Sequence, residues 1–264
     1  MTDGTLDFDE ALTVRTVGDG HLMADIAHGW DVRGNPHGGY LLALAAAAMG
    51  HIVRQPDPLS IAATYLAPPR VGRAELFVEV VRAGKRQSTA QLRLIQDDEE
   101  RLRATATFGV LADQPATALA ADVVAPKNLP APELCLPASA LEQAEGEPIN
   151  LHDRLELRFG PATGWLTGRP RGVAEVDGWL RFKDGRPVNA LALLMFSDGF
   201  PPSVFEQRGR GIGHVPTVQL TTHLFGRPAP GWIQARFRSR VQGGNFLDEG
   251  NLAADPFMQF SLWI

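Results

Sequence analysis

The sequence predicts an α+β protein of two similar halves, each an antiparallel sheet wrapped round a central helix. Two apolar runs, Tyr40–Met49 and Ala190–Gly199, are each followed by a series of strand-like segments. The same offset, about 158 residues, separates Pro58 from Pro216, Thr64 from Thr222 and Leu66 from Leu224. A period of this length is too long for a solenoid repeat and indicates domain duplication.

The helix expected in the first half covers Tyr40–Met49. It is apolar on every side, so we expect it to be buried. The preceding residues 34–39, Gly-Asn-Pro-His-Gly-Gly, are too rich in glycine for a helix interior. They predict a loop that leads into the N-terminus of this helix.

Strands follow this helix. The alternation of apolar and polar residues and the β-branched content predict four of them, at Leu59–Leu66, Glu75–Arg82, Gln91–Ile95 and Leu102–Phe108. Residues 84–86 and 97–100 lie between them and are expected to be hairpin turns.

Residues 113–149 differ from their surroundings in being rich in proline and alanine. We interpret them as a linker with room for a short helix near Ala138–Gln143. The predicted division is therefore an N-terminal unit, 1–112, the linker, 113–149, and a C-terminal unit, 150–264.

The C-terminal unit repeats the order of the first. Its expected helix, Ala190–Gly199, is stopped by Pro201 and Pro202. The expected strands are Asp153–Phe159, Ala174–Phe182, Val218–Phe225, Trp232–Val241 and Met258–Ile264.

Composition narrows the functional class. The formal net charge of −5 does not favour a general nucleic-acid binder, for which a basic stripe is expected. A single cysteine, Cys135, rules out an intramolecular disulfide and a cysteine metal cluster. The acidic N-terminus is not typical of a signal peptide, and no apolar run is long enough to span a bilayer. We therefore expect a cytoplasmic protein without a membrane or nucleic-acid partner.

Three short motifs carry a family resemblance: His-Gly-Gly-Tyr at 37–40, Gly-Trp-Leu-Arg at 178–181 with Asp-Gly-Arg-Pro at 184–187, and Ser-Asp-Gly at 197–199 ahead of Pro201-Pro202. In this order and spacing the chain resembles the double hot-dog proteins of the type II acyl-CoA thioesterase family. The resemblance covers nearly the whole chain. It implies a tandem hot-dog fold, acyl-CoA or a similar thioester as substrate, no cofactor or metal, and assembly into a homo-oligomer.

Asp198 is the first candidate catalytic residue. It is the acid in an otherwise apolar helix, whereas the corresponding helix of the first half carries no acid. A carboxylate in such a place costs free energy unless it is hydrogen-bonded or functional, although an acid at a helix end can also simply be solvated. The resemblance implies that Asp198 orients and deprotonates a water molecule.

The resemblance also implies a threonine and a glutamine that hold this water. Thr217 and Thr222 are the threonine candidates, and they are expected on opposite faces of one strand, with Thr221 on the face of Thr217. The sequence leaves open which face meets Asp198. Gln259 is the glutamine candidate.

The loop before the first helix supplies the candidate groups that would bind the substrate carbonyl. The N–H groups of Gly38 and Gly39 at a helix N-terminus favour developing negative charge on an oxygen. His37 either caps the helix or contacts the thioester oxygen, and Tyr40 is expected beside them. Candidates for the CoA phosphates are Arg86, Arg208 and Arg210, which are otherwise solvated turn residues.

Other enzyme classes are less well supported. The sequence contains no Gly-x-Ser-x-Gly elbow and no set of residues with metal-ligand spacing. A hot-dog enoyl-CoA hydratase would carry Asp-x-Asn-Pro-x-His. Here Asp31 lies two residues too early and His37 one too early relative to Asn35-Pro36. A non-catalytic acyl-binding protein is the remaining alternative.

Overall fold

The computed structural model describes residues 7–113, 129–139, 149–209, 215–244, 246–253 and 258–263, with only the backbone described from 251 onwards. The first half contains α1 (Phe8–Ala11), β1 (Val14–Gly18), β2 (His21–Ile26), β3 (Asp31–Val32), β4 (Asn35–Pro36), α2 (Gly38–Ile52), β5 (Asp57–Tyr65), β6 (Gly72–Ala83), β7 (Ser88–Gln96) and β8 (Glu99–Gly109). The second half contains η1 (Pro132–Leu134), β9 (Leu136–Pro137), η2 (Asn150–Asp153), β10 (Leu155–Phe159), η3 (Trp165–Thr167), β11 (Glu175–Phe182), α4 (Ala190–Phe196), α5 (Phe205–Arg208), β12 (Gln219–Leu224), β13 (Ile233–Gly243), β14 (Phe246–Ala253) and β15 (Met258–Trp263).

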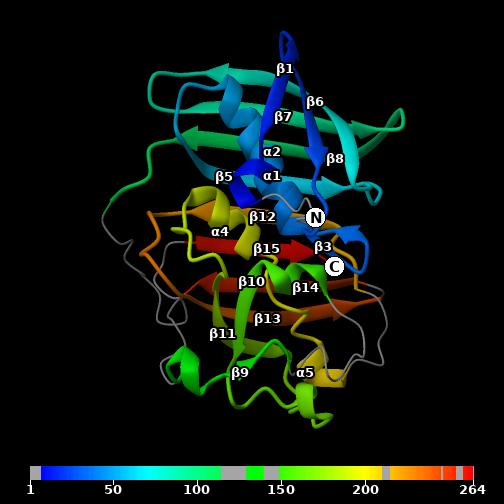
Figure 1. Cartoon of the computed structure of the whole chain (residues 1–264), viewed down its shortest axis with the longest axis vertical. Helices are drawn as coiled ribbons and strands as arrows, with labels where there is room; N and C mark the ends of the chain where they lie inside the picture. Colours follow the sequence, from blue (N-terminus) through cyan, green and yellow to red (C-terminus); the bar gives the residue numbers. More distant parts are fainter. Residues whose placement is uncertain are drawn as a thin grey trace, which may run out of the picture.

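The described strands, apart from the small β3–β4 pair, form one 13-stranded sheet in the order β1-β2-β6-β7-β8-β5-β12-β15-β14-β13-β11-β10-β9. Read from its outer edge to the centre, each half has the same order, apart from the additional edge strand β9 of the second half. The strand that follows the central helix, β5 or β12, is innermost. These two strands pair antiparallel, with Ile61 opposite Thr222, and so join the halves (Figure 1). The architecture is therefore that of a duplicated unit.

The two central helices contact each other and pack against the sheet, α2 against β5 to β8 and α4 against β5 and β12. In α2 the residues from Gly39 to Ala46 are all buried, as its uniformly apolar sequence predicts. Its alanines leave room for the neighbouring backbone. Helix α4 is shorter than expected and ends at Phe196. The Ser197 hydroxyl donates to the Leu194 carbonyl at 2.7 Å, and Asp198 lies in the following turn.

Most strands occur where the sequence predicts them, within a few residues. The turn at 97–100 is a two-residue turn in which Asp97 and Asp98 both have positive φ, as type I′ hairpins require. Strand β14 was not predicted, and β9 lies within the segment interpreted as a linker, where it pairs with β10. The helix expected near Ala138–Gln143 lies almost wholly outside the described residues.

The burial pattern corrects the alignment of the two halves by one residue. Ile61 and Ala63 of β5 face the core, as do Leu220 and Thr222 of β12. Thr64 is therefore not the counterpart of Thr222, because successive strand residues point to opposite faces. A shift of a single residue reverses the face of every side chain, which sequence spacing alone does not detect.

No helix in the described ranges is long and apolar enough to cross a membrane.

Candidate active site

The Asp198 carboxylate lies at the N-terminus of α2, although it belongs to the other half of the chain. The Gly39 N–H donates to Asp198 Oδ2 at 3.1 Å, and only 14% of the Asp198 side chain is exposed. The N-terminus of a helix favours negative charge because its first N–H groups lack intrahelical partners. The acid that the first half lacks is thus supplied to its helix by the second half.

His37 connects this carboxylate to α2. Its Nδ1 accepts from the Tyr40 N–H at 3.4 Å, which caps the helix. A neutral imidazole that accepts at Nδ1 carries its proton on Nε2. Nε2 therefore donates to the Asp198 main-chain carbonyl at 2.7 Å, and it also lies 3.4 Å from Asp198 Oδ2. His37 thus caps the helix, which is one of the roles that its sequence position left open, and it also holds Asp198, which the sequence did not indicate.

Two opposing effects act on the protonation of Asp198. Burial is the larger and raises the pKa of this carboxyl above its ordinary value of 3.8. The neighbouring His37, the Gly39 N–H, the Thr217 hydroxyl and the Gly38 N–H each lower it, in that order. The balance leaves a desolvated carboxylate that is a stronger base than an exposed aspartate.

Gly38 and Gly39 are required by the close approach of this carboxylate and of α4. A Cβ at position 38 would lie 2.6 Å from Asp198 Oδ2. A Cβ at position 39 would overlap the Met195 main-chain carbonyl oxygen. The first glycine therefore makes room for a side chain and the second for a backbone.

Tyr65, at the end of β5, is a site residue that the sequence did not reveal. Its hydroxyl donates to the Gly38 carbonyl at 2.7 Å. Burial and the nearby Asp198 charge hold the pKa of Tyr65 well above 10. No local sequence signal marks this residue, because only the path of β5 past the start of α2 brings it to the site.

The two threonine candidates have different partners. The Thr217 hydroxyl hydrogen-bonds to Asp198, from the segment just before β12. Thr222 is fully buried, and its hydroxyl donates to Ser197 Oγ at 3.2 Å. The structure therefore brings Thr217 to the carboxylate and Thr222 to the end of α4.

Gln259 remains a prediction. The backbone pairing places it opposite His223, an exposed residue of β12, whereas Phe260 is opposite Thr222. The register does not pair Gln259 with a residue that contacts Asp198.

Tyr40 contributes to the site through its backbone. Its ring is fully buried, and its hydroxyl accepts from the Ala27 N–H and donates to the Ala11 carbonyl, both at 3.0 Å. Both hydrogen-bonding functions of the hydroxyl are thus used within the core, and a contact between Tyr40 and substrate stays a prediction.

The candidate phosphate-binding arginines lie in different halves. Arg86 is exposed in the turn between β6 and β7, and Arg208 is exposed at the end of α5. Arg210 lies outside the described residues. The structure does not bring Arg86 and Arg208 into one cluster.

A cavity of about 550 Å³ lies at the opposite ends of the two helices, where α2 ends and α4 begins. Its lining includes Ala46, Ala47, Gly50, Asn189 and Ala190. By the internal repeat, this cavity corresponds to the Asp198 position at the other end of the helix pair. Here, however, α2 presents alanine and glycine instead of an acid. Only one of the two related positions therefore carries a helix-end carboxylate.

The loop that partly resembles a hydratase motif has a structural role. Asp31 is buried, and its carboxylate accepts from the Gly34 N–H at 2.9 Å and from Asn150 Nδ2 at 3.0 Å. It holds the β3–β4 turn and links the halves, which leaves it unsuited to act on a substrate. Among the described residues, no group of three or more His, Cys, Asp or Glu could hold a metal ion.

Comparison with known families matches both halves. Residues 26–109 match a model described as the acyl-CoA thioesterase N-terminal domain, and residues 132–252 match the corresponding C-terminal domain. Uncharacterized proteins of Mycobacterium tuberculosis and Mycobacterium bovis are 27% identical over 246 residues, covering 86% of this chain and 82% of theirs.

Solved structures show the same architecture. A protein of Thermobifida fusca provisionally named thioesterase II has a TM-score of 0.85 at 22% identity, covering 98% of this chain and 97% of its own. A hot-dog protein of unknown function from Alicyclobacillus acidocaldarius has a TM-score of 0.83 at 21% identity, with 97% and 96% covered. An acyl-CoA thioesterase II from Mycobacterium marinum has a TM-score of 0.69 at 16% identity, with 97% and 95% covered. The tandem hot-dog fold is thereby confirmed.

Proposed function

Because the chain belongs to the acyl-CoA thioesterase family with paired N- and C-terminal domains, we propose that it hydrolyses acyl thioesters such as acyl-CoA, with Asp198 as the general base. One observation carries the assignment of the base. Asp198 is a desolvated carboxylate, held at the start of α2 by groups from the other half and by Thr217. Perturbed, buried acids of this kind concentrate at functional sites.

In the proposed reaction Asp198 accepts a proton from a water molecule as the water oxygen attacks the thioester carbon. The carbonyl oxygen becomes an oxyanion, and the carbon–sulfur bond then breaks. The thiolate takes up the proton that Asp198 accepted, which regenerates the base, so the products are a carboxylic acid and a thiol. Thr217, bound to the same carboxylate, is the group we assign to orienting the water.

In this reaction the Gly38 and Gly39 N–H groups have two potential acceptors, the Asp198 carboxylate and the thioester carbonyl oxygen. Both contact the Asp198 carboxylate, and Gly38 has the smaller effect on its pKa. We therefore assign the Gly39 N–H to holding the base and the Gly38 N–H to the thioester carbonyl oxygen. Backbone donors preorganised in this way stabilise an oxyanion without reorientation during the reaction.

The test is hydrolysis of acyl-CoA, followed by release of free thiol, in the wild type and in Asp198→Asn. The variant keeps the size of the side chain but removes the base, so its rate should be about 10²–10⁴ lower. Asp184→Asn, which alters an exposed turn acid, is the matched control and should leave the rate unchanged. A rate for Asp198→Asn within about twofold of wild type would exclude this base. Binding of acyl-CoA without thiol release would instead favour the acyl-binding alternative.

The assignment of the phosphate contacts is tested separately. Arg208→Ala should raise KM for acyl-CoA and leave kcat unchanged, because a phosphate contact stabilises the bound substrate and the transition state equally. The same substitution should have no effect on a short thioester that lacks the nucleotide. An effect on kcat for both substrates would contradict a phosphate contact.

A further inference from the structure

A group of polar side chains is buried in the core of the second half, next to Asp198. Ser197, Ser203 and Thr222 are fully buried, and Glu249 is 1% exposed. Buried polar groups cost free energy unless they are hydrogen-bonded, and a buried carboxyl costs the most. The proposed mechanism uses none of these four residues, and Glu249 is the ionisable one among them.

The strand register places Glu249 on the helix-facing side of the sheet. Glu249 of β14 is opposite Leu262 of β15, and Leu262 is opposite Leu220 of β12. Leu220 is fully buried on the same face of β12 as Thr222, which contacts the end of α4. Directly opposed residues in a sheet share a face. The Glu249 side chain therefore faces the region that contains the end of α4 and Asp198 in the turn that follows.

Its hydrogen bonds reach the segment that continues from Asp198. The Ser203 N–H donates to Glu249 Oε1 at 2.6 Å, and the Ser203 hydroxyl also hydrogen-bonds to this carboxyl. The same hydroxyl lies 3.0 Å from Ser239 Oγ of β13. Ser203 is the fifth residue after Asp198, so the carboxyl of Glu249 anchors the far end of a short, proline-containing connection that starts at the base.

The two carboxyls also interact electrostatically. The pKa of Glu249 is raised to about 7: burial raises it most, the bonds from Ser203 lower it, and the charges of Asp198 and Asp248 also raise it. On the other side of the pair, Asp198 faces His37, Tyr65 and Thr217. Carboxyls that interact in this way titrate as a pair rather than independently.

We propose that Glu249 is a positioning residue for Asp198: it anchors the segment that carries the base and, once ionised, repels the Asp198 charge and strengthens that base. This inference rests on the proposed function. When water gives its proton to Asp198, negative charge leaves that carboxylate and moves toward the thioester oxygen. An ionised Glu249 favours this transfer, because the transfer moves negative charge away from the Glu249 carboxylate.

The consequence is a rate profile with two steps. Because the charge of Asp198 is among the causes that raise the pKa of Glu249, we expect Asp198 to ionise first as pH rises, so that activity appears while Glu249 is still neutral. Glu249 then ionises near pH 7, and the rate rises again. The second rise should be roughly threefold to tenfold, since general-base efficiency increases with the pKa of the base.

The experiment measures kcat/KM between pH 5 and 9 for the wild type and Glu249→Gln, on an acyl thioester of N-acetylcysteamine. This probe carries no phosphate, so its own charge does not change in this range. Wild type should show the rise near pH 7, and Glu249→Gln should show only the first step. The variant keeps an oxygen acceptor for the Ser203 N–H, so the anchor is largely retained.

Glu206→Gln is the matched control, because Glu206 is also a fully buried glutamate on the segment after Asp198 but is paired with Arg171. Its profile should retain the rise near pH 7. A rise that persists in Glu249→Gln, or a variant whose rate is lowered by the same factor at every pH, would overturn the proposal.

Unfolding separates this inference from the proposed function. The pKa of Glu249 is raised in the folded state, so its contribution to stability is present at low pH and is lost as pH rises through about 7. The unfolding midpoint of the wild type should therefore fall relative to that of Glu249→Gln as pH rises toward about 7. This fall should be smaller when both proteins also carry Asp198→Asn. If wild type shows these shifts but releases no thiol, the proposed function fails although the carboxyl pair exists. If the shifts are absent, the pair does not exist and the inference fails alone.

Discussion

At the scale of single residues, the two glycines at the start of α2 have different steric duties. At position 38 the nearest obstacle is a carboxylate oxygen at the end of a side chain, whereas at position 39 it is a backbone carbonyl of α4. A side chain can adjust its rotamer at modest cost, but a packed helix backbone cannot shift without disturbing the core. The same type of substitution should therefore have different effects at neighbouring positions.

We expect Gly38→Ala to fold but to lose much of its hydrolytic rate, because the added methyl group displaces the Asp198 carboxylate. Gly39→Ala should instead lower the free energy of unfolding by about 1–3 kcal/mol, the usual cost of overpacking. Gly50→Ala, at the other end of the same helix, is the control. Its Cβ would lie 3.5 Å from the Phe108 ring, an ordinary contact, so it should be neutral or stabilising by up to about 1 kcal/mol. Thiol release and urea unfolding measure the two effects. If Gly38→Ala and Gly39→Ala lost hydrolytic rate and stability to the same extent, this distinction would be contradicted.

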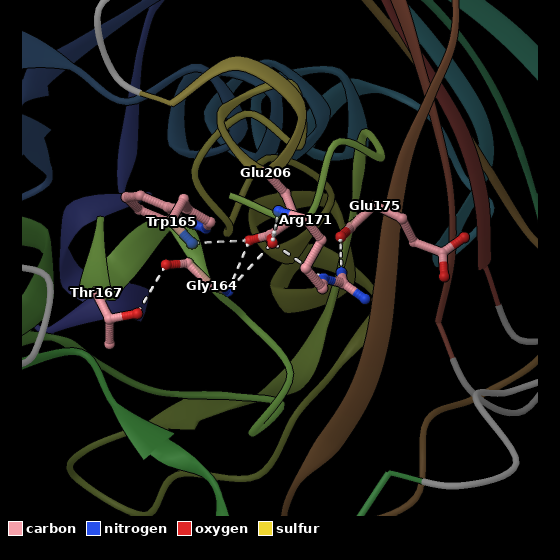
Figure 2. Close-up of polar contacts among 6 residues, drawn as sticks. All are labelled: Gly164, Trp165, Thr167, Arg171, Glu175 and Glu206. Atoms are coloured by element: carbon pink, nitrogen blue, oxygen red, sulfur yellow. Dashed lines mark hydrogen bonds and ion pairs between the residues drawn. The ribbon is translucent and has the colours of Figure 1, made fainter. Parts of the chain in front are cut away.

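At the scale of elements, a buried glutamate joins α5 to the loop that contains η3. Glu206 accepts from the main-chain N–H groups of Gly164 at 3.0 Å, Trp165 at 3.1 Å and Arg171 at 2.8 Å, and from Arg171 Nε at 3.0 Å (Figure 2). Arg171 in turn donates to the Glu175 carbonyl at 2.6 Å. The loop is thereby fastened to the element that immediately follows Ser203.

We expect Glu206→Ala to lower the free energy of unfolding by about 3–5 kcal/mol, because it leaves an arginine and several buried N–H groups without their acceptor. Amide hydrogen exchange should accelerate at residues 164–171 before it accelerates in β6 and β7. Glu99→Gln, which removes an exposed charge paired with Arg101, should change stability by less than about 1 kcal/mol. Unchanged exchange in the loop would show that Glu206 does not fasten it.

At the scale of the whole molecule, the halves are joined by more than the β5–β12 pair. The α1 residue Phe8 lies with its ring centroid 4.9 Å from that of Phe182, and Asp9 accepts from Arg186 at 2.7 Å. Asn150 donates to Asp31, and α2 packs on α4. Each half thus completes the core of the other, and the site itself is shared between them.

We therefore expect one cooperative unfolding transition rather than one for each half. Scanning calorimetry should give a single peak, with a van't Hoff enthalpy close to the calorimetric enthalpy. Exchange measured at amides of β6 and of β13 should report the same global free energy. Two separable peaks would mean that the halves are independent domains. Assembly into a homo-oligomer stays a prediction, and light scattering on the same sample tests it.

The sequence by itself determined the two central helices, most of the strands around them and their duplication. The apolar runs that became α2 and α4, the alternating strands and the proline stops are local signals, and each was sufficient to predict its element. Asp198 was also marked locally, as the lone acid in an otherwise apolar expected helix, although the structure places it in the turn that follows α4. The spacing of Asp31 and His37 around Asn35-Pro36 was likewise sufficient to set the hydratase motif aside, and the structure gives Asp31 a structural role.

Only the tertiary structure decided which groups meet at the site. His37 and Tyr65 reach Asp198 from the other half, and Glu249 reaches its neighbourhood across two strands. These contacts depend on strand register and on the antiparallel union of β5 with β12, where a shift of one residue exchanges the buried and exposed faces. Register is determined by the packing of the whole core, so no local stretch of sequence contains the information that places these side chains together.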